Sequence, residues 1–195
     1  PNNIGDKDVI YIGATTSRDV PKIMAIASQG SSLYIYEISP EMIQGKKGTI
    51  CSGYWELTPE TGLVEGKLPV ATSAYFDRMF YYAVGNKIYR ADLTRSTPRS
   101  YEIYAHPDPS VRITRLKFRS QREDRWDISG GDVVEAIPYD FVSYLGGVAE
   151  YPDGNCSMLE MKLTAAGEID KEEGTKDLMV YEFKGFKNVV DFVYA

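Results

Sequence analysis

The feature that most constrains the fold is a strand–turn–strand unit that recurs three times along the chain. Lys22–Ser28 turns through residues 29–31 into Ser32–Ile38, Arg78–Val84 turns through Gly85 and Asn86 into Lys87–Leu93, and Tyr144–Tyr151 turns through residues 152–155 into Cys156–Leu163. Glycine and asparagine tolerate the positive φ angles of tight hairpin turns. No long stretch has the apolar spacing of an amphipathic helix. The pattern therefore predicts antiparallel hairpins.

Further short runs rich in Tyr, Val, Ile and Phe supply a third and a fourth strand after each hairpin. These additional runs are Thr49–Leu57, Val70–Phe76, Tyr101–Ala105, Val111–Phe118, Asp177–Phe183 and Val189–Ala195. One extra run, Val9–Ala14, precedes the first hairpin. We therefore expect an all-β chain, residues 1–195 forming a single domain of β-propeller-like blades with four antiparallel strands each. The expected units are about 22–76, 78–118 and 144–195. Propellers close with roughly four to eight blades, so three units predict part of a larger propeller. A small four-bladed ring, a curved open sheet and a β-sandwich are the alternatives.

The link over residues 119–143 is predicted to be a long loop, because it shows no regular pattern of its own. Links of this length are usually functional in a compact domain. This link carries Trp126 and Tyr139 near Asp132 and Asp140, a combination of rings and carboxylates that suits contact with a sugar or a peptide. The alternative is that its aromatic side chains fold back to cap a blade while its charges are simply solvated.

A fifth candidate binding residue is Trp55, which follows Tyr54 in a predicted strand. Successive side chains of a strand point to opposite faces, so only one of these two rings can face the core. An outward Trp55 would be a stacking platform for a ligand, whereas an inward Trp55 would be blade packing. The pattern favours the inward orientation and leaves the ligand role as the alternative.

The scarce residue types and the charge exclude several classes of function. With 22 Lys and Arg against 28 Asp and Glu, the net charge of −6 disfavours a nucleic-acid partner, which requires a basic surface. The single histidine, His106, cannot supply a typical catalytic zinc site, and its neighbouring prolines predict a turn at a strand end. Cys51 and Cys156 lack metal-binding spacing, and a disulfide between them stays open. No apolar run reaches the roughly 18 residues of a transmembrane segment.

No motif for a cofactor or a nucleophile is complete. The chain has no GxGxxG and no GxSxG sequence, and Gly45–Thr49 resembles a phosphate loop without its full spacing. We therefore expect a protein that is not an enzyme and has no metal or cofactor. The alternative is a propeller-type glycosidase or lyase that uses paired carboxylates, because acidic residues are plentiful.

Four segments resemble the C-terminal, propeller-like region of the PKD-like family of surface lipoproteins from Bacteroidetes. These segments are Lys87–Leu93, Tyr144–Asn155, Leu178–Phe183 and Phe186–Tyr194. Members of that family are accessory proteins of SusC/SusD-type importers in the outer membrane. The resemblance implies a location at the cell surface, with any lipid anchor upstream of residue 1, and no catalytic residues.

The resemblance and the residues together predict a non-enzymatic binding or accessory module of a nutrient uptake system. Its expected partner is an oligosaccharide, a peptide or a SusC/SusD-type transporter. The expected ligand-binding residues are Trp126, Tyr139, Asp132 and Asp140, followed by Trp55. A purely structural interaction scaffold is a further alternative.

Overall fold

The protein is an all-β chain in the computed structural model, as the sequence predicts. The structure describes residues 4–14, 23–38, 51–63, 73–76, 79–129 and 132–194. These residues contain twelve strands and two short 3₁₀ turns, η1 (Ile4–Asp6) and η3 (Pro59–Thr61), and no α-helix. The strands form in the runs of aromatic and β-branched side chains, which fit a pleated, partly buried surface. Nowhere in the described ranges is there a helix long and apolar enough to cross a membrane.

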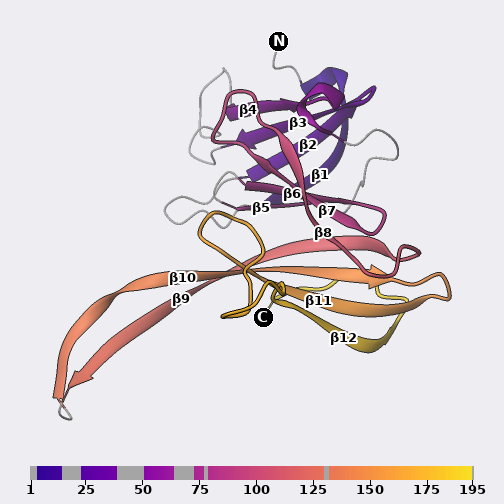
Figure 1. Cartoon of the computed structure of the whole chain (residues 1–195). Helices are drawn as coiled ribbons and strands as arrows, with labels where there is room; N and C mark the ends of the chain where they lie inside the picture. Colours follow the sequence, from indigo (N-terminus) through magenta and orange to yellow (C-terminus); the bar gives the residue numbers. More distant parts are fainter. Residues whose placement is uncertain are drawn as a thin grey trace.

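The strands form three antiparallel sheets of four strands each, and sequence neighbours are also neighbours in each sheet (Figure 1). The first sheet contains β1 (Asp8–Ala14), β2 (Ile23–Gln29), β3 (Ser32–Ile38) and β4 (Cys51–Leu57). The second sheet contains β5 (Ser73–Phe76), β6 (Met79–Val84), β7 (Lys87–Asp92) and β8 (Ser100–Ala105). The third sheet contains β9 (Arg112–Ser129), β10 (Asp132–Glu150), β11 (Asn155–Leu163) and β12 (Val180–Lys187).

Two of the predicted hairpins have the shortest possible loops. The β2–β3 ladder runs up to the two-residue loop 30–31, and the β6–β7 ladder runs up to the loop 85–86. Gly30 has a φ of 61° and Gly85 a φ of 59°. This left-handed region carries a steric penalty for residues with a Cβ, and glycine avoids that penalty. The hairpin predictions are confirmed here.

The predicted boundaries of the units 22–76, 78–118 and 144–195 are wrong by one strand. The strand expected to end the first unit is β5, which begins the second sheet, with Phe76 opposite Met79. The strand expected to end the second unit is β9, which begins the third sheet by pairing with β10. Only residues 77 and 78 separate β5 from β6, and so short a link forces the two strands into a hairpin.

The predicted loop over residues 119–143 is also wrong, because β9 and β10 continue through it as one long hairpin. This hairpin extends well beyond the rest of the molecule (Figure 1). The sequence of this ribbon shows no apolar alternation, which is the signal that identifies a half-buried strand. The pairing also shifts between Ile137 and Asp140, at a bulge that includes Pro138. Proline has no N–H for the ladder and is tolerated at bulges, so the periodic pattern is broken here.

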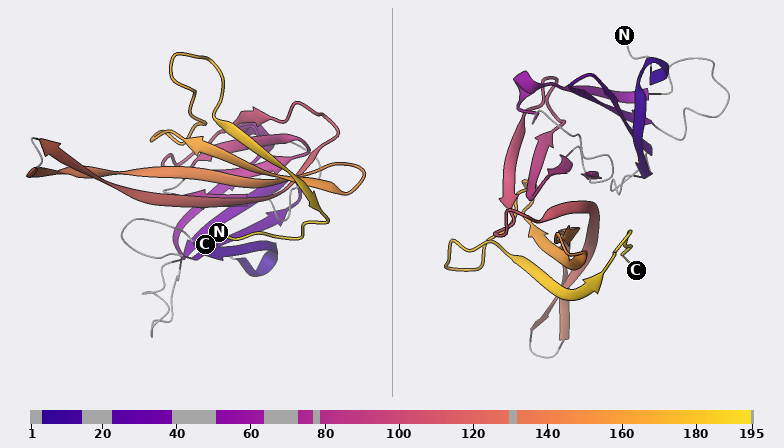
Figure 2. Two further views of the ribbon diagram at one scale, coloured as in Figure 1. Left: turned by 90° about the horizontal axis from the view of Figure 1, so that it is seen from below. Right: turned by 90° about the vertical axis from the view of Figure 1, so that its right-hand side faces the viewer.

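The second sheet is the middle layer of the molecule. Figure 1 and the right-hand view of Figure 2 both place it between the other two sheets. Phe80 and Tyr82 on one face pack into a core with the first sheet, and Tyr81 and Ala83 on the other face pack into a core with the third sheet. Since alternate side chains of a strand point to opposite faces, an uninterrupted apolar run is what a two-sided layer requires.

The C-terminal residues 188–194 cover the outer face of the third sheet. They form no strand, so the predicted strand Val189–Ala195 is wrong within the described residues. The rings of Phe192 and Tyr194 lie directly over Gly146 in β10, where a Cβ would collide with the Tyr194 hydroxyl. Lys117 in β9 forms an ion pair with Asp191 at 2.9 Å. A sheet face that carries glycine and long cations can be covered in this way by a single extended segment.

Candidate functional site

A pocket of about 700 Å³ opens along the edge of the second sheet. Its lining comes from β7, the β7–β8 connection, β8 and the connection between β11 and β12. The lining residues are Arg90, Asp92, Arg95, Thr97, Arg99, Tyr101, Glu102, Ile103 and Glu168. The pocket is rich in guanidinium and carboxylate groups and contains one exposed aromatic ring, Tyr101, which is 50% exposed.

The alternation of β7 places two charged residues at the rim of the core. Ile88, Arg90 and Asp92 share one face of the strand, and Ile88 is buried in the core between the second and third sheets. Arg90 and Asp92 continue the same face beyond that core. The β7–β8 connection then begins with a turn in which the Asp92 carboxylate accepts hydrogen bonds from the backbone N–H (2.9 Å) and hydroxyl (2.6 Å) of Thr94.

These contacts hold Asp92 in its ionised form. Partial burial raises the pKa of the Asp92 carboxyl. The two hydrogen bonds from Thr94 and the nearby positive charges of Arg90 and Arg95 lower that pKa, and together they outweigh the effect of burial. The net effect is a pKa below the usual aspartate value. Asp92 therefore anchors the turn and balances part of the positive charge in the pocket.

The connection between β11 and β12 forms one wall of the pocket by reaching across to the second sheet. The Tyr81 hydroxyl donates a 2.6 Å hydrogen bond to the Gly167 carbonyl, and the Arg90 guanidinium donates to the Ala166 carbonyl. Gly167 has a φ of 79°, and a Cβ there would lie 2.7 Å from the Tyr81 hydroxyl oxygen. Both the backbone conformation and the close approach require glycine at this position. Burial raises the pKa of the Tyr81 phenol, so the donor keeps its proton.

The charges of the pocket are only partly paired. Arg90 lies 3.8 Å from Glu168, and Lys87, next to the pocket, lies 3.3 Å from Glu102. Arg95 and Arg99 are exposed and have no ion pair within 4.0 Å in the described part of the chain. Guanidinium groups bind carboxylates and phosphates through paired N–H donors. The pocket can therefore hold a ligand with hydroxyl and acidic groups against the Tyr101 ring.

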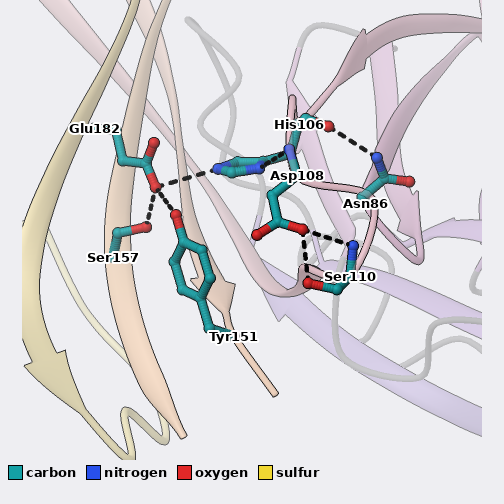
Figure 3. A network of polar contacts seen from close by, with 7 residues as sticks. All are labelled: Asn86, His106, Asp108, Ser110, Tyr151, Ser157 and Glu182. Atoms are coloured by element: carbon teal, nitrogen blue, oxygen red, sulfur yellow. Dashed lines mark hydrogen bonds and ion pairs between the residues drawn. The ribbon is translucent and has the colours of Figure 1, made fainter. Parts of the chain in front are cut away.

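A second cluster of chemically interesting residues lies between the second and third sheets (Figure 3). One oxygen of the Glu182 carboxylate, Oε1, accepts hydrogen bonds from Ser157 Oγ at 2.5 Å and Tyr151 Oη at 2.7 Å. His106 Nε2 lies 3.1 Å from the same oxygen. His106 Nδ1 accepts a 3.0 Å hydrogen bond from the backbone N–H of Asp108. Because Nδ1 is an acceptor, the network assigns the ring proton to Nε2, which donates to Glu182.

This arrangement does not match a serine nucleophile with a histidine base. In such a site the histidine accepts the proton of the serine hydroxyl. Here the Ser157 hydroxyl points to Glu182, and both His106 nitrogens already have partners. Burial raises the pKa of Glu182, but the hydrogen bonds from Ser157, Tyr151 and His106 outweigh this and lower it. The cluster therefore ties the connection after β8 to the edge strand β12.

The predicted position of His106 agrees with the structure, but its role extends beyond a turn. His106 directly follows β8 and is only 5% exposed. Its backbone N–H donates to the Asn86 carbonyl at 2.8 Å, and Asn86 Nδ2 donates back to the His106 carbonyl at 2.9 Å. The residue therefore links the β6–β7 turn, the β8–β9 connection and the third sheet.

The structure places four of the predicted site residues on the β9–β10 hairpin, away from the pocket. Trp126 pairs with Ala136 across the hairpin, Asp132 with Ser129, and Asp140 with Glu123, while Tyr139 belongs to the bulge before Asp140. These are backbone positions, and the side chains of all four residues lie outside what the structure describes. The four residues therefore lie on the two strands of one paired ribbon, and the predicted loop is absent from these positions.

Trp55 is part of the core, so the ligand role assigned to it is wrong. Its side chain is 8% exposed and packs with β2, β3 and the second sheet. The ring lies over Gly53, where an added Cβ would collide with it. The two cysteines, Cys51 in the first sheet and Cys156 in the third, are both free.

The pocket residues Arg90, Arg95, Arg99 and Tyr101 were not predicted from the sequence. The available signal was a cluster of three arginines around a proline-containing connection between two strands. That signal alone does not distinguish a binding site from a solvated turn, because the wall formed by residues 164–168 comes from a distant part of the chain. Among the described residues, no group of three or more His, Cys, Asp or Glu side chains is placed to hold a metal ion.

Comparison with known proteins adds no family assignment. No protein-family model matches the chain, and no curated protein matches it.

Proposed function

We propose that the chain is a non-enzymatic ligand-binding module, built of propeller-like blades that form part of a larger propeller. The observation that carries this proposal is the open pocket of about 700 Å³, in which an exposed tyrosine ring adjoins two exposed arginines without ion pairs among the described residues. Aromatic rings and a few well-placed polar groups are typical of sites that bind small ligands. The ligand class is an oligosaccharide or a peptide.

The propeller-like architecture is supported by the order and stacking of the sheets. Each sheet is a four-stranded meander, and the second sheet packs one face against each neighbour. These are features of propeller blades, which are four-stranded sheets arranged around a common axis. The first and third sheets are the ends of this series. The first sheet would contact a further blade in a complete ring, whereas residues 188–194 cover the outer face of the third sheet.

The cellular context of the proposal rests on the resemblance to PKD-like surface lipoproteins. By this proposal the module lies at the cell surface, on the outer membrane, as an accessory of a SusC/SusD-type importer. In that setting a binding module would capture nutrient glycans or peptides for the transporter.

The proposal is tested by isothermal titration of the chain against panels of neutral and acidic oligosaccharides and short peptides. We expect saturable binding that weakens at least about tenfold in Tyr101→Ala, because this ring provides the exposed apolar surface of the pocket. The matched control is Tyr181→Ala, since Tyr181 on β12 is similarly exposed (44%) but lies outside the pocket. Binding that is equally strong in Tyr101→Ala and in the wild type would refute a role for the pocket.

A second candidate function is docking to a protein partner through the β9–β10 hairpin. The observation that favours it is the projection of this hairpin beyond the body of the molecule (Figure 2, left). A two-stranded ribbon with free edges can add a strand from a partner. Trp126→Ala, included in the same titrations and in pull-downs with the candidate transporter, separates the two functions. Loss of transporter capture in Trp126→Ala, with ligand binding intact, would support docking by the hairpin.

A further inference from the structure

We infer that the pocket on the second sheet selects ligands that carry a carboxylate, held by Arg95 and Arg99. This inference rests on the proposed binding function of the same pocket and adds the chemical class of the ligand. It follows from which charged groups in the pocket already have a hydrogen-bond or ion-pair partner and which do not.

Most charges in the pocket already have a partner. The Arg90 guanidinium donates to the Ala166 carbonyl and lies 3.8 Å from Glu168. Glu102 lies 3.3 Å from Lys87. The Arg90 side chain is 13% exposed, so it forms the inner wall of the pocket and has little contact with solvent. Arg90 therefore shapes the pocket and adds positive charge to it, but it offers a ligand few accessible N–H donors.

The remaining positive groups are Arg95 and Arg99, both exposed on the β7–β8 connection. Arg95 is close enough to Asp92 to help lower the pKa of that carboxyl. Arg99 forms no ion pair within the described ranges. The two arginines flank Thr97, which also lines the pocket. This part of the lining therefore offers an acidic ligand two guanidinium groups.

The connection that carries these arginines is held by local contacts. Its start is fixed by the hydrogen bonds from Thr94 to Asp92, at 2.9 and 2.6 Å. Near its end, Pro98 is buried, and the next strand begins at Ser100. Arginines on a restrained connection lose less conformational freedom on binding than arginines on a free chain, and this favours affinity.

The balance of charges favours a carboxylate over a phosphate. Asp92, Glu102 and Glu168 line the same pocket, so a dianionic phosphate would meet three nearby carboxylates. A ligand with one negative charge and several hydroxyl or amide groups fits better, because the arginines take the charge and the carboxylates accept hydrogen bonds. A carboxylate of this kind is present in a uronic-acid sugar and in an acidic peptide.

The test measures the affinity of the full chain for three probes by isothermal titration calorimetry. The probes are aldotriouronic acid (one uronic acid joined to two neutral sugars), its carboxyl-reduced neutral counterpart and the capped tripeptide acetyl-Ser-Glu-Ser-amide, so that each acidic probe carries one negative charge. We expect an acidic probe to bind at least about tenfold more tightly than the neutral sugar, and more weakly at roughly 300 mM salt than at 50 mM. Tighter binding of aldotriouronic acid assigns the carboxylate to a sugar, and tighter binding of the capped tripeptide assigns it to a peptide.

Three variants separate the arginine contacts from a general effect of charge. Arg95→Gln and Arg99→Gln should each reduce the preference for the acidic probe at least about fivefold while leaving the affinity for the neutral sugar unchanged. The control is Arg112→Gln, since Arg112 is 69% exposed in the third sheet and lies outside the pocket. Circular dichroism verifies that each variant is folded.

Two results would overturn the inference, and they differ in what they imply for the binding function. Equal affinity for the acidic and the neutral sugar, or a preference that survives in both arginine variants, removes the carboxylate selectivity but keeps a binding pocket. No binding of any probe or of any member of the wider panels removes the pocket as a binding site altogether.

Discussion

Replacing Glu182 by alanine should destabilise the protein far more than a surface substitution of the same type. The carboxylate accepts three hydrogen bonds, from Ser157, Tyr151 and His106. Ser157 is fully buried and His106 is 5% exposed, so neither donor can readily bond to water instead. Tyr151 is only half-buried, and its hydroxyl can turn towards solvent.

The expected magnitude follows from the two buried donors. A buried donor left without a partner costs about 1–3 kcal/mol, so two such donors give about 2–6 kcal/mol. The Glu182 side chain is itself 25% exposed, so water replaces part of the lost acceptor. We therefore expect the free energy of unfolding to fall by about 2–4 kcal/mol in Glu182→Ala. In Glu182→Gln, a neutral carbonyl oxygen remains as acceptor, and the expected loss is about 1 kcal/mol.

The assay is urea denaturation at pH 7, with the slope of the transition compared between proteins to verify two-state behaviour. The matched control is Glu150→Ala, which breaks a 2.8 Å ion pair in the same sheet with Arg112, a side chain that is 69% exposed. An exposed pair of this kind contributes about 0–1 kcal/mol. If Glu182→Ala and Glu150→Ala lost the same free energy, the hydrogen-bond network would not be the source of the stability.

The pH dependence gives a second, independent test of the same network. The pKa of Glu182 is lowered in the folded state, so its ionised form is favoured by folding. The resulting stability is fully present above the pKa of the unfolded glutamate and is lost as the pH falls through the folded value. The stability difference between the wild type and Glu182→Gln should therefore shrink below the usual glutamate pKa. A difference that grows on acidification would contradict the assigned direction.

Three further substitutions test the pocket wall and the outer face of the third sheet, each by urea denaturation. Gly167→Ala should cost about 1–3 kcal/mol, more than Gly174→Ala, because both glycines have a positive φ but only Gly167 lies against Tyr81. Tyr81→Phe removes the hydrogen bond to the Gly167 carbonyl and should lower the free energy of unfolding by about 1–2 kcal/mol. Because the Tyr81 pKa is raised on folding, the stability difference between the wild type and Tyr81→Phe should decline as the pH rises above the usual tyrosine pKa. Tyr194→Ala uncovers Gly146 and removes a ring that lies 5.2 Å from the Arg119 guanidinium, with an expected loss of about 1–2 kcal/mol. An unchanged stability in any of these variants would refute the contact on which its prediction depends.

The hairpins could be predicted from the sequence because the information that specifies them is local. Gly30 and Gly85 mark turns whose flanking residues already have the strand pattern. The boundaries between sheets could not be predicted in the same way. In a chain of consecutive meanders, each strand pairs with the strands that precede and follow it, except where the chain passes from one sheet to the next. The order of the strands in the sequence does not show which links make that passage. The link of residues 58–72 between β4 and β5 makes that crossing, whereas residues 77 and 78 do not.

The β9–β10 hairpin shows a second limit of periodicity. Alternation of apolar and polar residues reports a strand only where one of its faces is buried. The inner part of the hairpin satisfies this condition, since Leu116 and Leu145 are buried in the core with the second sheet. The outer part leaves that core and keeps its pairing through backbone hydrogen bonds, which depend little on the identity of the side chains. Residues 119–129 and 132–143 therefore have the composition of a loop and the backbone of a strand.

The candidate pocket could not be predicted because the contacts that form it join distant parts of the sequence. Arg90 donates to the carbonyl of Ala166, 76 positions away, and Tyr81 donates to that of Gly167, 86 positions away. Neither pair has a sequence signature, since any exposed backbone carbonyl can accept such a bond. What the sequence does contain is the glycine required at 167, where both the φ angle and the Tyr81 hydroxyl exclude a side chain. The arginines on the β7–β8 connection become a site only once this second wall is in place, so the pocket is a property of the packed second and third sheets.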